Sequence, residues 1–264
     1  MRAQTTMLPR SRLPAVLLLV MSLLGAAHAK PPESLAIEPT GPGEAAAAVS
    51  PHARLMQFLL QGVEDPDQLR GYRVAILAAD GVDGFDLTVP RHFLMERGAT
   101  VHLIVPRPAK ALQAAGSGAI VKPKTQIAVL DPSGEHDQAA FDRFVDQVQA
   151  RDYDVVYLPG NRGLSRELAQ PPSVGFLQQA ERAGTPIFAI GNAALALLDA
   201  GLLDERRATG DAATLERLAT STARATDAAL VSDGPIHTSR HAFDMPALME
   251  SLIATLLTRP VAKQ

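Results

Sequence analysis

The chain has 264 residues, of which 47% are hydrophobic and 20% are charged, a composition typical of a globular domain with a sizeable apolar core. A formal net charge of −3, an aromatic content of 4% and the lack of tryptophan argue against a nucleic-acid-binding surface. Because the sequence contains no cysteine, it excludes disulfide bonds and every reaction that uses a thiol.

The first 29 residues have the features of a cleaved export signal. Arg2, Arg10 and Arg12 precede a short apolar stretch, and the small residues of "AHA" at 27–29 follow it. The apolar stretch is too short for a comfortable membrane span, although an uncleaved anchor is the alternative. We therefore expect cleavage after Ala29, a periplasmic or secreted location, and no stable membrane insertion afterwards.

Residues 30–55 are rich in proline, alanine, glutamate and glycine and show no apolar periodicity. This composition predicts a flexible linker, followed by a folded domain over residues 56–264. One short amphipathic helix is expected at the junction, over residues 53–62.

Within the domain, apolar runs of strand length alternate with helical patterns. The runs predict buried parallel strands at 73–80, 100–106, 154–160 and 186–191, and residues 228–240 predict a hairpin. Helices are expected at 87–98, 136–152, 172–184 and 193–203, with a last one over residues 245–257. This alternation predicts an α/β fold, a doubly wound, mostly parallel sheet with helices on both faces.

Ligands of such sheets bind beyond the carboxyl ends of the strands, where three loops are informative. Residues 80–87 carry Asp80, Asp83 and Asp86 at calcium-loop spacing, but the remaining calcium ligands are missing. Residues 158–164 form a glycine-rich turn whose backbone N–H groups can face an anion. At Gly191 and Asn192 an apolar strand turns abruptly into a helix, the geometry of a nucleophile elbow.

These loops, in this order, resemble the ThiJ/PfpI family of class I glutamine-amidotransferase-like proteins. The resemblance covers roughly residues 72–258, in segments 74–106, 152–164, 184–209 and 233–257. It implies a flavodoxin-like sandwich that is usually a homodimer. Members include hydrolases, hydratases, glyoxal-handling enzymes, chaperone-like proteins and ligand-sensing domains of transcription regulators.

The resemblance also implies where a site would lie. Enzymes of the family place a reactive cysteine at the elbow, commonly followed by histidine, and here these positions hold Gly191 and Asn192. The family's acidic residue falls on Asp86, its oxyanion-hole amides on Asn161 and Asn192, and a further histidine of some members near Asp211. Glycine adopts the strained elbow backbone almost freely, so the turn can persist without its nucleophile.

Three functions follow from this reading. The first is a catalytically silent protein that binds a small polar metabolite in a pocket lined by Asp86, Gly160, Asn161, Gly191, Asn192 and Asp211. The second is a hydrolase or hydratase in which Asp86, as general base, activates water. The third is a chaperone-like dimer, which would expose large apolar patches.

The segment "IHTSRH" raises two other possibilities. His237, Ser239 and His241 would share one face of a strand, as a substituted serine–histidine pair requires. The histidines could also combine with Asp211 and Asp244 around a metal, but the spacing matches no known ligand pattern. We expect neither a metal nor another cofactor.

Overall fold

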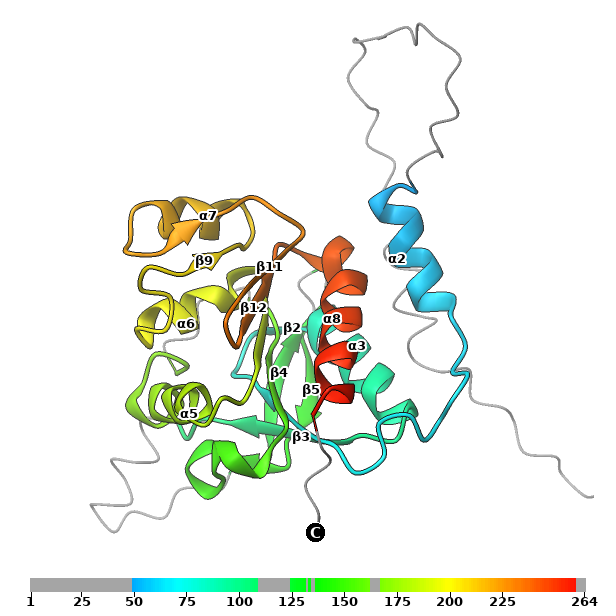
Figure 1. Cartoon of the computed structure of the whole chain (residues 1–264). Coiled ribbons are helices and arrows are strands. Elements are labelled where there is room, and N and C mark those ends of the chain that lie inside the picture. The colour runs from blue at the N-terminus through cyan, green and yellow to red at the C-terminus, as the bar shows by residue number, and fades with distance from the viewer. Residues whose placement is uncertain (1–48, 109–123, 132, 134–135, 162–166, 260–264) are drawn as a thin grey trace, which may run out of the picture. The chain divides into compact units, whose positions relative to one another are not determined.

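A seven-stranded sheet forms the centre of the fold (Figure 1). The structure, a computed structural model, describes residues 49–108, 124–131, 133, 136–161 and 167–259, which belong to one unit spanning residues 45–264. The signal predicted for 1–29 and most of the linker predicted for 30–55 lie outside the described residues. Within the described ranges, no helix is long and apolar enough to cross a membrane.

The strand order is β11-β12-β8-β7-β1-β3-β6, and all neighbours are parallel except β11 and β12, which form the predicted hairpin. All residues of β7 and β8 are buried, as expected for strands covered on both faces. The mostly parallel doubly wound sheet predicted from the alternation of apolar runs is therefore confirmed. The strands are β1 (Arg73–Leu77), β3 (Thr100–Val105), β6 (Arg143–Phe144), β7 (Val155–Leu158), β8 (Ile187–Ile190), β11 (Leu230–Asp233) and β12 (Ile236–Ser239).

Helices cover both faces of this sheet (Figure 1). The helices are α2 (Pro51–Leu60), α3 (Gly84–Glu96), α5 (Pro171–Arg182), α6 (Ala194–Asp199), α7 (Ala212–Ala219) and α8 (Met245–Leu257). Helices α5 and α6 lie on one side, and α3 and α8 lie on the other. The last residues of the predicted linker, 51–55, already belong to α2, whose Leu55 and Phe58 are buried.

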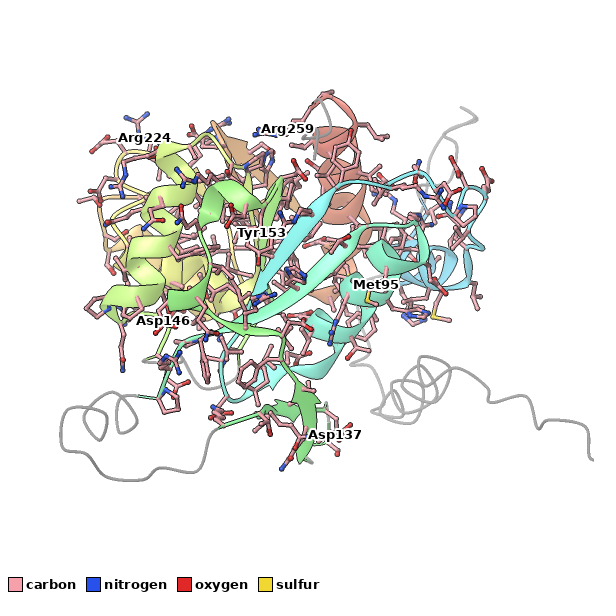
Figure 2. All side chains as sticks on the ribbon, turned by 90° about the horizontal axis from the view of Figure 1, so that it is seen from below. Met95, Asp137, Asp146, Tyr153, Arg224 and Arg259 are labelled. Atoms are coloured by element: carbon pink, nitrogen blue, oxygen red, sulfur yellow. The ribbon has the colours of Figure 1, made fainter. Side chains whose placement is uncertain are left out.

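Alternate residues of the central strands point to the two layers. Ala75 and Leu77 of β1 belong to the core cluster that includes Phe176 and Leu177 of α5. Figure 2 shows the side chains from below and labels Tyr153, which is buried, and Met95, which is half-exposed. The core thus fixes the strands from both sides and leaves their carboxyl ends to form loops.

The helix predicted over residues 136–152 is wrong. These residues form β5 (His136–Ala140), β6, and two short 3-10 helices, η1 (Val145–Gln147) and η2 (Ala150–Asp152). Antiparallel pairing with β4 (Gln126–Leu130) makes β5 a strand, and Asp142 holds the next turn against β3 through two bonds with the Leu103 backbone, of 2.7 and 2.8 Å. Pairing with the preceding strand β4 and with the more distant strand β3 therefore overrides the local helical pattern.

Small elements complete the fold. Strand β2 (Val82–Asp83) joins β4 and β5 in a three-stranded sheet, and β9 (Arg207–Ala208) pairs with β10 (Arg224–Ala225). Two further 3-10 helices, η3 (Gly191–Ala193) and η4 (Ala242–Asp244), precede α6 and α8. Both short helices follow the carboxyl ends of β8 and β12, where the candidate site lies.

Candidate functional site

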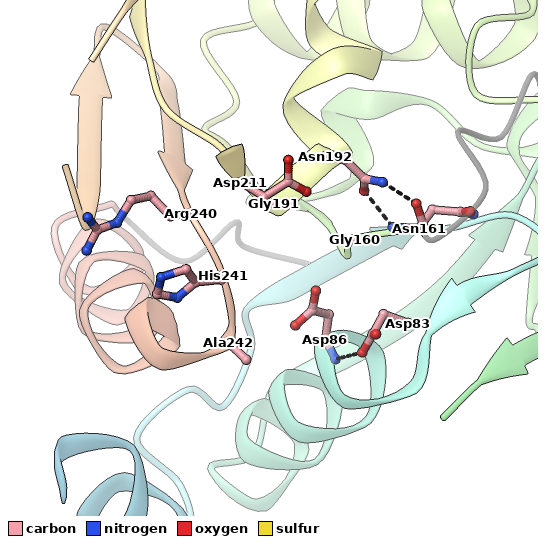
Figure 3. A pocket seen from close by; sticks show the side chains of 10 residues that line it. All are labelled: Asp83, Asp86, Gly160, Asn161, Gly191, Asn192, Asp211, Arg240, His241 and Ala242. Atoms are coloured by element: carbon pink, nitrogen blue, oxygen red, sulfur yellow. Dashed lines mark hydrogen bonds between the residues drawn. The ribbon is translucent and has the colours of Figure 1, made fainter. Parts of the chain in front are cut away.

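A pocket of about 530 Å³ opens at the carboxyl ends of β7, β8 and β12 (Figure 3). It brings together all six residues that the sequence suggested for a binding site. Beside them it contains four residues that the sequence did not assign to the pocket. The lining residues are Asp83, Asp86, Gly160, Asn161, Gly191, Asn192, Asp211, Arg240, His241 and Ala242.

Gly191 occupies the elbow directly after β8. Its φ is +61°, in the left-handed region that a side chain with a Cβ disfavours, as the sequence predicted. A Cβ added there would lie 3.5 Å from the carbonyl oxygen of Arg240 and 3.9 Å from Asp211 Oδ2. Both distances are ordinary contacts, so the elbow has room for a Cβ, and it is the backbone conformation that favours glycine here.

Asp86 enters the pocket from the first turn of α3. Asp83 caps this helix, because its Oδ1 accepts hydrogen bonds from the N–H groups of Phe85 at 3.0 Å and Asp86 at 3.2 Å. The Asp86 side chain lies so close to Gly160 that a Cβ there would be 2.6 Å from Asp86 Oδ2. Glycine at position 160 therefore leaves the space that the Asp86 carboxylate occupies. Asp86 is almost completely buried there, with 9% of its surface exposed.

Tyr157 of β7 holds the same turn of α3 through a hydrogen bond to its backbone. Its hydroxyl donates a hydrogen bond to the carbonyl oxygen of Asp86 at 2.8 Å, and the whole side chain is buried. Burial, and then the nearby charges of Asp86 and Asp83, raises the pKa of the Tyr157 hydroxyl well above its ordinary value. The hydroxyl therefore stays protonated and keeps donating at neutral pH.

Asn192 and Asn161 form a closed pair on one side of the pocket (Figure 3). The Asn161 backbone N–H donates to Asn192 Oδ1 at 2.8 Å, and Asn192 Nδ2 donates back to the Asn161 carbonyl oxygen. The expected oxyanion hole included this Asn161 amide. In the structure this amide already donates to the side chain of Asn192.

Arg240 and His241 form the opposite wall. The Arg240 guanidinium donates to Asp244 through Nε at 2.8 Å and Nη2 at 3.2 Å, and to Asp227 through Nη1 at 2.9 Å. Hydrogen bonds to these two carboxylates, Asp244 first, raise the pKa of Arg240. His241 Nδ1 lies 3.5 Å from Asp244 Oδ2. Arg240 follows β12 directly, so its position at a strand's carboxyl end is the signal that could have identified it.

The serine–histidine pair considered for "IHTSRH" does not form. His237 stacks on Phe188 with ring centres 4.1 Å apart, and its Nδ1 pairs with Ser232 Oγ at 2.8 Å. Ser239 is fully buried, and its Oγ has no hydrogen-bond partner among the described residues. The described part of the chain also brings no three histidine, aspartate or glutamate side chains together around a possible metal position.

Comparison with known proteins identifies the family of this chain. The model of the DJ-1/PfpI family matches residues 72–255, which is most of the chain. The chain belongs to the DJ-1/PfpI family. A relative among characterised proteins is a deglycase of Thermococcus kodakarensis, 25% identical over 185 residues that cover 70% of this chain and 99% of the relative.

Solved structures of DJ-1/PfpI proteins share the fold. A two-domain protein of Anabaena variabilis, with DJ-1/ThiJ/PfpI-like and ferritin-like domains, matches with a TM-score of 0.59 and 23% identity, over 70% of this chain and 48% of that one. This chain thus spans about half of the Anabaena protein. Drosophila melanogaster DJ-1beta matches with a TM-score of 0.56 and 21% identity, over 71% and 91% of the two chains.

Proposed function

We propose that this DJ-1/PfpI-family protein is exported, does not use the cysteine mechanism of the family's enzymes, and binds a small polar molecule in the pocket above Gly191. One observation carries the proposal: the elbow keeps its shape and its pocket while the position of the nucleophile holds glycine. The chain has no cysteine at any other position that could take over the role of the nucleophile, since it contains none at all.

The missing thiol supports catalytic silence. A covalent mechanism needs an activated nucleophile at the elbow, and Gly191 has no side chain to supply one. Asn192, the next residue, holds the backbone of Asn161 with both polar atoms of its amide. The deglycase from Thermococcus kodakarensis is therefore a guide to the fold of this chain, and we expect no cysteine-dependent deglycase turnover.

The size and chemistry of the pocket support a binding role. A volume of about 530 Å³ lies within the range of roughly 300–1,000 Å³ that is usual for small-molecule sites. Polar groups from the loops after β7, β8 and β12 converge on it, and α3 adds Asp86. Such convergence of a few polar groups in one concave site is typical of small-ligand recognition.

A hydrolase or hydratase based on Asp86 is the second candidate. The buried carboxylate of Asp86 faces the pocket beside Gly160, where a general base could act on water. The Asn161–Asn192 pair weakens this candidate, because it removes one of the two amides that would stabilise an oxyanion. Binding without turnover therefore stays the preferred function.

A metabolite screen separates the two functions. We expect some small polar compounds to raise the melting temperature of the wild-type protein, because a ligand that binds only the folded state stabilises it. The variant Asp86→Asn should change this response, whereas Asp199→Asn, an exposed aspartate of α6, should not. A flat screen would contradict the binding function, and turnover that Asp86→Asn abolishes would establish the hydrolase.

A further inference from the structure

Two important donor groups of the pocket are already engaged inside the protein. The Asn161 N–H donates to Asn192 Oδ1 at 2.8 Å. The Arg240 guanidinium donates to Asp244 and Asp227, and in Figure 3 it points away from Asn192. A carboxylate or other oxyanion in the pocket would have to break one of these arrangements to gain either donor, at the cost of an unpaired group.

Acceptor oxygens border the space above Gly191. A Cβ at this position would lie 3.5 Å from the Arg240 carbonyl oxygen and 3.9 Å from Asp211 Oδ2, the two nearest atoms. The other carboxylate oxygen of Asp211 accepts the Thr214 N–H at 2.8 Å and caps α7. This cap fixes the carboxylate, so Oδ2 stays directed toward the elbow (Figure 3).

We propose that the pocket selects ligands that carry a protonated primary amine, and that Asn192 is the residue that excludes oxyanions. The ammonium group would lie in the space into which a Cβ of residue 191 would point, and it would donate to Asp211 Oδ2 and the Arg240 carbonyl oxygen. An ammonium has three donors and no acceptor, and its bonds to a carboxylate are charge-assisted. This inference rests on the proposed binding function and names the class of its ligand.

Two small probes test the ligand class on the ¹⁵N-labelled full chain. The protein is titrated with ethanolamine, which carries the amine, and separately with acetate, which carries the oxyanion. Backbone amide signals of Gly191 and Asn161 are followed by NMR. We expect ethanolamine to shift the Gly191 signal in a saturable way, and acetate to leave the Asn161 signal without saturable change.

Two variants assign the roles of the residues. Asp211→Asn keeps the cap of α7, because asparagine caps helices as well as aspartate, and should weaken ethanolamine binding about tenfold through the lost charge-assisted bond. Asp199→Asn makes the same charge change at an exposed position and should leave the affinity unchanged. Asn192→Ala should release the Asn161 N–H, so that acetate shifts the Asn161 signal in a saturable way.

The outcomes separate this inference from the binding function on which it rests. Acetate binding at Asn161 of the wild type in preference to ethanolamine, or ethanolamine binding that Asp211→Asn leaves unchanged, would overturn the inference alone. Unchanged acetate behaviour of Asn192→Ala would overturn the role of Asn192. A wild type that responds to neither probe overturns the inference, and only a flat metabolite screen as well would overturn the binding function.

Discussion

At the scale of a single residue, Gly191 keeps the backbone conformation of the elbow but has no side chain that could react. We predict that Gly191→Cys folds and loses roughly 1–3 kcal/mol of unfolding free energy, because its φ of +61° is unfavourable for a residue with a Cβ. A clash of the Cβ does not add to this cost, since its nearest atoms would lie 3.5 and 3.9 Å away. Urea unfolding measures the loss.

Gly201 supplies the matched control for this substitution. Its φ is +71°, and an added Cβ would meet nothing within 4 Å, so Gly201→Cys has the same backbone cost without a pocket around it. Iodoacetamide should label both variants and leave the wild type unmodified, because the wild type has no thiol. A much larger loss of stability for Gly191→Cys than for Gly201→Cys would contradict the claim that the elbow has room.

Gly160 and Asp86 form the second residue-scale prediction. An added Cβ at Gly160 would lie 2.6 Å from Asp86 Oδ2, closer than atoms approach without displacement. Gly160→Ala should therefore lower the unfolding free energy by roughly 1–3 kcal/mol, the usual cost of overpacking. The cost should be clearly smaller in an Asp86→Ala background, and a double-mutant cycle measures the difference. Equal costs in both backgrounds would contradict the contact.

The Asn192–Asn161 pair shows what single residues in a sequence do not reveal. The sequence places both residues at the carboxyl ends of β7 and β8, and the structure confirms that placement. Whether the Asn161 N–H faces a ligand or the Asn192 amide depends on one side-chain rotamer and on the distance between two loops. Neither quantity follows from residue types, so the oxyanion hole was expected where a closed pair exists.

At the scale of elements, the stacking of His237 of β12 on Phe188 of the neighbouring strand β8 predicts a dependence of stability on pH. Burial lowers the pKa of His237 below its ordinary value of 6.5. As the pH falls below about 6.5, the unfolded chain therefore binds a proton at this residue before the folded chain does, and the unfolding free energy decreases. Above that pH the imidazole is neutral in both states and contributes no such dependence.

The variant His237→Gln removes this titration. We expect its unfolding free energy to fall less between pH 7 and pH 5 than that of the wild type, as measured by urea unfolding at each pH. Part of the dependence should remain, because burial also lowers the pKa of His102. A variant whose stability falls as steeply as that of the wild type would show that His237 does not cause the effect.

Helices and strands could be predicted from the sequence where the hydrophobic pattern fits only one type of secondary structure. The apolar runs at 73–80 and 186–191 contain β1 and β8, because a continuous apolar run between turn residues fits a strand buried on both faces. Residues 136–152 carry a helical spacing, yet β5 pairs with β4 and Asp142 bonds to Leu103. Leu103 lies 39 residues before Asp142, and the pairing of β5 with β4 does not follow from the helical spacing of residues 136–152, so this segment could not be decided from its own pattern.

At the scale of the whole molecule, the order of the loops carried more information than any one of them. A glycine-rich turn or a strand-to-helix corner alone is common, but their collinear arrangement predicted the sheet and the six pocket residues that the structure brings together. Arg240 was missed although it follows β12 directly, because the position of the hairpin β11–β12 beside β8, which brings this strand end to the pocket, is a property of the complete sheet.

The last prediction concerns the start of the mature protein. The basic residues Arg2, Arg10 and Arg12, the short apolar stretch and the small residues at 27–29 together predict an export signal. The first described helix begins only at Pro51, so removal of residues 1–29 takes nothing from the fold that the structure describes. We therefore expect protein from an exporting bacterial host to begin at Lys30 and to be found in the periplasm or the medium.

Intact-mass spectrometry and cell fractionation check this expectation together. A chain of 264 residues in the membrane fraction would indicate an uncleaved anchor, and a soluble cytosolic protein would contradict export. A matched control replaces Ala27 and Ala29 with bulky residues, which should block cleavage because the cleavage site requires small side chains. If that variant is processed at the same position as the wild type, the site after Ala29 is not the one that the signal uses.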